Sequence, residues 1–203
     1  MPVIEIPWGN PGEAQPCPEG LVNAGLEHST DLGDDSRGRG SGGWLVAGEV
    51  TIRLAVSSER AELEALQRRV SLENPVYREA LFAHPDAIEL PLGQIASGDV
   101  FVAEVDGTVV GFAALRPRAD DDVDLDGLFV EHRMQRRGIG RLLVEHCVDV
   151  GRQRGCRALM VIANPHAKDF YLACGFEMVG ETQTRFGAAL LMRLRLNSSA
   201  ARS

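Results

Sequence analysis

The sequence has few of the residues that mark several classes of protein. Its 203 residues include only 4 cysteines, and aromatic residues make up 5%. The cysteines are Cys17, Cys147, Cys156 and Cys174. They form no C-x-x-C pair and have no histidine at metal-ligand spacing, which argues against a disulfide framework and a zinc knuckle. We therefore expect no metal site.

Long apolar runs and an excess of positive charge are also missing. No run approaches the ~20 residues of a membrane-spanning helix, and the N-terminus lacks the basic and apolar segments of a secretory signal. We expect a cytoplasmic protein with no membrane contact. The formal net charge is -8, which disfavours nucleic acid as a partner because phosphate recognition needs a basic surface.

Composition divides the chain into three parts. Residues 1–48 hold ten of the 22 glycines and five of the 10 prolines and show no sustained helical or strand period, so we expect a disordered extension. Residues 49–197 carry the periodic segments and form one domain, and residues 198–203 form a frayed tail. We find no internal repeat.

The domain alternates between strand and helix patterns. Strands are predicted at 50–56, 99–105, 109–115, 123–130, 158–163, 176–183 and 189–196. Helices are predicted from a cap at Ser57 or Ser58 to about Arg69, and at 75–84, 139–154 and 165–174, with a short helix or lid within 86–98. The second and third strands are joined through Asp106-Gly107, a strong hairpin signal. This order gives the α/β (α+β) class, with a mixed, mostly antiparallel central sheet flanked by helices.

The segment from Val123 to Leu143 reads as strand, turn and helix, and its turn is suited to an anion. The first N–H groups of a helix lack intrahelical partners and carry the positive end of the dipole. In Gln135-Arg-Arg-Gly-Ile-Gly140, glycines let a phosphate approach the main chain and arginines add charge. A pyrophosphate group is the anion that this turn is best suited to bind. The alternative is a turn that binds no ligand and whose arginines are solvated.

This turn resembles the R/Q-x-x-G-x-G/A signature of the GNAT superfamily of acyl-coenzyme A dependent N-acyltransferases. A second segment, with Asn164-Pro165, Phe170-Tyr171 and Cys174-Gly175-Phe176, is similar to the family's late F-Y-x-x-x-G-F motif. The resemblance extends over about Val50 to Leu196. It implies the GNAT fold and acetyl-coenzyme A as acyl donor.

The resemblance also implies roles for individual residues. Tyr171 would be the acid that protonates the coenzyme sulfur. The backbone of Leu128, Phe129 and Val130 would pair with pantetheine, and Asn164 would face pantetheine, cap its helix, or both. The pyrophosphate would be held by Arg136, Arg137, Gly138, Ile139, Gly140 and Arg141.

Asp124 and Asp126 are the candidates for the base, acting directly or through water. Residues two apart on a strand project from the same face unless a bulge intervenes. Two alternatives remain open: a solvated acidic face at a sheet edge, or a pair that binds a cationic acceptor without deprotonating it. The strand 158–163 carries no acidic residue.

The resulting hypothesis is an N-acetyltransferase that moves an acetyl group from acetyl-coenzyme A to a primary amine in a ternary complex. The acceptor is a small molecule or a protein amino group, and the final strands can pair across a homodimer. The alternative is a non-catalytic module that senses acyl-coenzyme A and regulates a partner.

Overall fold

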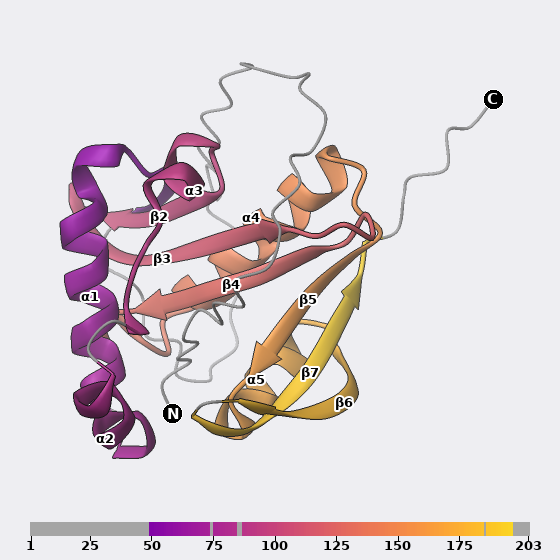
Figure 1. The fold of residues 1–203 in the computed structure, drawn as a ribbon. Helices are drawn as coiled ribbons and strands as arrows, with labels where there is room; N and C mark the ends of the chain where they lie inside the picture. The colour runs from indigo at the N-terminus through magenta and orange to yellow at the C-terminus, as the bar shows by residue number, and fades with distance from the viewer. Residues whose placement is uncertain (1–48, 74, 85–86, 185, 197–203) are drawn as a thin grey trace, which may run out of the picture.

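The protein is built on one seven-stranded sheet with helices on both faces (Figure 1). The computed structural model describes residues 49–73, 75–84, 87–184 and 186–196. The strand order is β1-β2-β3-β4-β5-β7-β6, and all neighbouring pairs are antiparallel except β4 with β5. The strands are β1 Val50–Leu54, β2 Val100–Val105, β3 Thr108–Pro117, β4 Val123–Val130, β5 Ala158–Ala163, β6 Glu177–Thr184 and β7 Gly187–Arg195. The sheet confirms the predicted fold class.

The helices divide between the two faces of the sheet. They are α1 Arg60–Glu73, α2 Pro75–Ala83, α3 Leu92–Ala96, α4 Ile139–Gln153 and α5 Lys168–Ala173, with short 3-10 turns η1 Ser57–Glu59, η3 His132–Met134 and η4 Pro165–Ala167. Helices α1, α2 and α3 pack with β2, β3 and β4 around one apolar core. Helices α4 and α5 cover the opposite face around a second core.

Alternation along the strands explains the two cores. In β4, Leu128 packs into the α4 side and the next residue, Phe129, packs into the α1 side, and both are fully buried. On α4, Ile139, Leu143 and Cys147 recur at helical spacing and are buried against the sheet. Burial on both faces makes β4 a central strand.

Two turns follow from their residues as the sequence predicted. Asp106 and Gly107 join β2 to β3 with φ of 50° and 73°, the left-handed conformations that a tight hairpin needs. Gly155, with φ of 73°, ends α4.

Some predicted boundaries were wrong. Strand β1 ends at Leu54 rather than residue 56, and the side chain of Glu59, not a serine, caps the next turn by accepting from Val56 N–H at 2.8 Å. Helix α1 continues to Glu73, past the predicted end. Strand β3 continues to Pro117 because its last residues still pair with β4.

The predicted extension at 1–48 and the predicted tail at 198–203 lie outside the described residues. None of the described helices is both long and apolar enough to cross a membrane.

Candidate active site

The parallel strands β4 and β5 separate near the start of β4, after Asp124 (Figure 1). They pair at two positions, the second being Asp124 opposite Met160. If the pairing continued in this register, Asp126 would lie opposite Ile162. The pairing ends before that position, and a small hollow opens between the two strands. Its lining residues are Arg116, Asp124, Leu125, Asp126 and Ile162.

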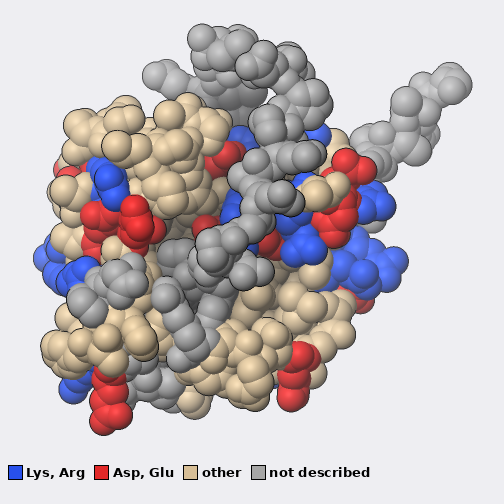
Figure 2. All heavy atoms as spheres, viewed as in Figure 1, with Lys and Arg blue, Asp and Glu red and all other residues tan. Residues whose placement is uncertain are grey.

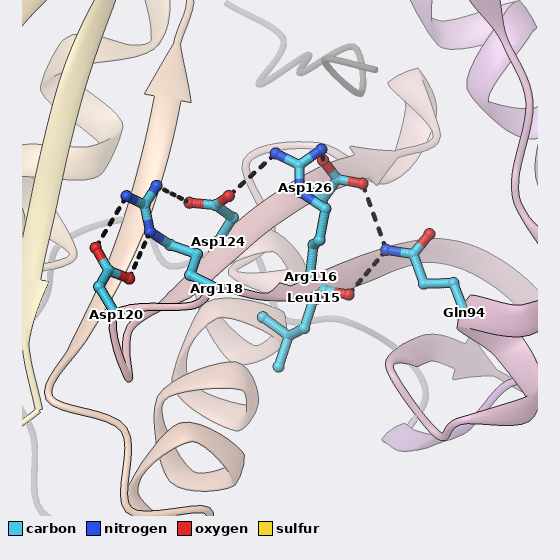
Figure 3. A network of polar contacts seen from close by, with 7 residues as sticks. All are labelled: Gln94, Leu115, Arg116, Arg118, Asp120, Asp124 and Asp126. Atoms are coloured by element: carbon cyan, nitrogen blue, oxygen red, sulfur yellow. Dashed lines mark hydrogen bonds and ion pairs between the residues drawn. The ribbon is translucent and has the colours of Figure 1, made fainter. Parts of the chain in front are cut away.

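Asp126 occupies a bulge in β4. Ala114 of β3 is opposite Gly127, and Leu115 is opposite Leu125, so Asp126 has no partner in the register. A bulge bends its strand and redirects a side chain, and bulges are common next to active sites. Asp124 and Asp126 nevertheless project to the same side, because both face one guanidinium (Figure 3).

Arg116 of β3, Arg118 just after it and three aspartates form a chain of ion pairs along this side of the sheet (Figure 3). Arg116 lies 3.0 Å from both carboxylates, with Nη2 at Asp124 and Nη1 at Asp126. Arg118 contacts the other oxygen of Asp124 at 3.1 Å and Asp120 at 3.0 Å. Asp124 is thus held between two guanidiniums, whereas Asp126 meets only one.

Asp126 is the most enclosed acid of the network, with a side chain that is 9% exposed. Burial raises its pKa, and the charge of Arg116 and a bond from Gln94 partly oppose that rise. Gln94, from α3, donates to the Leu115 carbonyl at 2.8 Å and to Asp126 Oδ2 at 3.4 Å. A carboxylate whose pKa is raised toward neutrality is suited to accept a proton.

The predicted anion turn has the backbone that such a site requires. Gly138 precedes α4 with φ of 84°, and Arg136 also has a positive φ of 63°. Nothing lies within 4 Å of the position that a Gly138 Cβ would occupy, so the helix terminus is open there. Arg136 and Arg137 are exposed, as a charge that meets a ligand from solvent should be.

Other residues of the turn have contacts that the sequence did not indicate. The side chain of Gln135 donates to the Val130 carbonyl at 3.0 Å and so fastens the turn to the end of β4. Arg141 pairs with Glu145 at 2.9 Å, one turn further along α4. Gly140 lies 3.5 Å from the ring of Phe170, measured from its ideal Cβ position, so it also permits close packing of α5.

Tyr171 lies in the core between α4, α5 and the sheet. Its side chain is fully buried, with edge contacts to Phe170 and Phe176 at ring-centroid distances of 5.0 Å and 5.2 Å. Tyr171 is therefore a residue of the packed core and does not lie at the surface of its helix.

Asn164 is a buried cap directly after β5. Its Oδ1 accepts from His166 N–H at 2.9 Å, and its amide nitrogen donates to the hydroxyl of Tyr77 on α2. Tyr77 also meets Phe186, between β6 and β7, edge-on at 6.2 Å. These contacts join α2, the end of β5 and the last hairpin on one side of the opening.

The acidic pair is not a solvated face at a sheet edge, and that alternative was wrong. Strand β4 is fourth of the seven strands, and Asp124 and Asp126 are 17% and 9% exposed at their side chains. Sequence reasoning missed Arg116 because the predicted strand stopped at Leu115, and a longer hairpin register would have found it. Gln94 had no local signal, since its contact depends on the docking of α3.

The predicted residues of the turn, Gly138 to Arg141, begin α4. Residues Leu128 to Val130 lie beyond the β4–β5 pairing and have no strand partner on that side in the described chain. Among the described residues, no group of three or more histidine, cysteine or acidic side chains is placed to hold a metal ion.

Comparison with known proteins places this architecture in a family. The acetyltransferase of the GNAT family from Streptococcus pneumoniae is 25% identical with a TM-score of 0.58, and the match covers 73% of this chain and 100% of that one. The ribosomal-protein-S18-alanine N-acetyltransferase from Escherichia coli is 22% identical with a TM-score of 0.56, covering 76% and 99%.

N-acetylglutamate synthase from Neisseria gonorrhoeae, in complex with coenzyme A and N-acetyl-glutamate, is 23% identical with a TM-score of 0.57. The match covers 75% of this chain but only 36% of that protein, so the likeness is to one part of it. A search of curated proteins finds no match. The family model for GNAT acetyltransferases matches residues 66–176, more than half of the sequence, and the chain therefore belongs to the GNAT family of acetyltransferases.

Proposed function

We propose that this protein is an N-acetyltransferase that transfers the acetyl group of acetyl-coenzyme A directly to a primary amine of a small molecule or a protein. The observation that carries the proposal is the hollow at Asp126, which opens where β4 and β5 separate. A buried carboxylate beside an opening between two strands puts a proton acceptor next to a path for a thioester arm.

In this proposal the coenzyme occupies the opening and the turn before α4. The main chain at 138–140 binds the pyrophosphate, with Arg136, Arg137 and Arg141 supplying charge, and Arg141 leaves Glu145 to do so. The pantetheine arm pairs with the backbone of Leu128 to Val130 as an added strand would. Asn164 faces the same arm while it caps its own turn.

The chemistry follows from these positions. The amine gives a proton to Asp126, directly or through a water beside Asp124, and its lone pair attacks the thioester carbonyl carbon. The nitrogen of the tetrahedral intermediate loses a second proton to solvent, the carbon–sulfur bond breaks, and the sulfur leaves as a thiolate. Tyr171 gives its proton to that sulfur, and solvent restores both groups to their starting states.

Calorimetric titration with acetyl-coenzyme A, followed by a thiol-release screen over amines and N-terminal peptides, tests this function. We expect binding and release of one thiol per acetylated amine. Desulfo-coenzyme A should bind without release. Absence of coenzyme binding would refute the proposal, and binding without turnover of any amine would favour an acyl-coenzyme A sensor.

A further inference from the structure

The deepest acid of the candidate site has one oxygen that no described donor satisfies. Asp126 Oδ1 is fully buried and has Arg116 Nη1 at 3.0 Å, but the pair is not aligned as a hydrogen bond. The other oxygen receives only the long 3.4 Å bond from Gln94. Buried carboxylate oxygens normally accept hydrogen bonds, so a ligand with N–H groups would complete this one.

The charges around this oxygen do not balance. The network holds three carboxylates, those of Asp120, Asp124 and Asp126, against the two guanidiniums of Arg116 and Arg118. With all five groups ionised its net charge is -1. One ammonium group placed at Asp126 brings that sum to zero.

A carboxylate on the acceptor would find no free guanidinium in this network. Both terminal nitrogens of Arg116 already face aspartates, and Arg118 uses its Nε and both terminal nitrogens on Asp120 and Asp124. Figure 2 shows basic and acidic side chains interleaved at the right of this face, rather than a separate basic patch. An acceptor carboxylate held near its amine would meet three like charges.

We infer that the acceptor is a cationic amine with no carboxylate on the carbon that bears the reacting nitrogen, and that its N–H donates to Asp126 Oδ1. The inference rests on the proposed function and narrows its acceptor class. Decarboxylated amines and lysine side chains belong to that class, and free α-amino acids reacting at the α-nitrogen do not.

Pairs of probes that differ by one carboxylate test this selection. We would measure binding of phenethylamine against phenylalanine, and of histamine against histidine, to the coenzyme A-saturated protein at low salt. The amine of each pair should bind at least about tenfold more tightly, with the preference shrinking as salt screens it. Equal binding, preference for the amino acid, or no binding of either amine would overturn the inference.

Two substitutions that each remove one negative charge distinguish binding at Asp126 from an effect of the protein's overall charge. Asp126→Asn should weaken binding of the amines about tenfold or more. It should also reduce the difference in affinity between each amine and its amino acid. Asp149→Asn, on the exposed side of α4 where Asp149 pairs with Arg152, should change neither. Equal effects of the two would point to bulk charge and count against the site.

A thiol-release assay with the same probes shows whether the selectivity for amines fails or the proposed acetyltransferase activity fails. Selective amine binding without thiol release from these or any other screened amines supports the selectivity for amines and refutes acetylation. Thiol release with amino acids as readily as with their amines refutes the acceptor class and leaves acetylation standing.

Discussion

Replacing Arg116 by glutamine should raise the pKa of the Asp126 carboxyl. The guanidinium is the only cation that contacts Asp126 in the described chain, and it stabilises the charged form of the acid against the cost of burial. Glutamine keeps a polar, though shorter, side chain and removes the charge. Asp126 would then hold its proton to a higher pH.

The magnitude follows from the distance and the exposure. Two unit charges 3.0 Å apart interact by about 1.4 kcal/mol in water and about 5.5 kcal/mol at an effective dielectric constant of about 20. Because the Arg116 side chain is 39% exposed, solvent screening favours the low end of this range, and the pKa of Asp126 should rise when the charge is removed.

Carbon-13 NMR of aspartate-labelled protein measures this shift without reference to turnover. Asp126→Asn identifies the resonance, which should titrate above the ordinary pKa of 3.8 in the unsubstituted protein and higher still in Arg116→Gln. Arg118→Gln is the matched control, since Arg118 contacts Asp120 and Asp124 but not Asp126. An unchanged or lower midpoint in Arg116→Gln would refute the electrostatic account.

The remaining predictions concern the turn, the buried tyrosine and the packing of α4. Gly138→Ala forces a left-handed alanine at φ of 84° and should cost about 1–2 kcal/mol of stability and weaken coenzyme binding about tenfold. Gly155→Ala, at φ of 73° beyond the other end of α4, should cost similar stability in denaturant melts but leave coenzyme affinity unchanged. Tyr171→Phe should lower turnover about 10²-fold with unchanged coenzyme affinity, and an unaltered rate would remove the proposed acid. Gly151→Ala places a Cβ 2.6 Å from Leu196 Cδ1 and should destabilise the fold by about 1–3 kcal/mol in thermal melts.

The acidic residue Asp126 also gives a pH dependence of stability with a definite sign. Its pKa is raised in the folded protein, so between 3.8 and that raised value the folded chain binds more protons than the unfolded chain. The contribution of Asp126 to stability therefore falls as pH rises through this window. Asp126→Asn should remove that part of the slope in melts recorded across the window.

Local signals were enough to predict most elements of the fold. The Asp106-Gly107 hairpin, the change of period after Gly138 and the glycine after α4 each depend on neighbours in sequence, and each is found where expected. The strand predicted at 158–163 is found with those bounds as β5, which lies between β4 and β7.

The contacts of the candidate site could not be predicted from local residue patterns, because they depend on how separate elements pack together. The bulge that leaves Asp126 without a partner in β3 has no local signal in the residue pattern, so it could not be predicted from the sequence. The partners Gln94 and Arg116 come from other elements, and their contacts depend on how α3 docks and how far β3 extends. The burial of Tyr171 likewise depends on the packing of α5 against the sheet.

The fold places the two aspartates in unequal surroundings. Asp124 is paired with β5 through its backbone and held by two guanidiniums, so it has little freedom to move and little need of another partner. Asp126 sits one step beyond the last pair, buried, with a misaligned cation and one long hydrogen bond. Burying a carboxylate with so little compensation lowers stability. An amine that donates to Asp126 would restore that lost compensation, so the feature that weakens the free protein there is also the one that would favour binding of an acceptor.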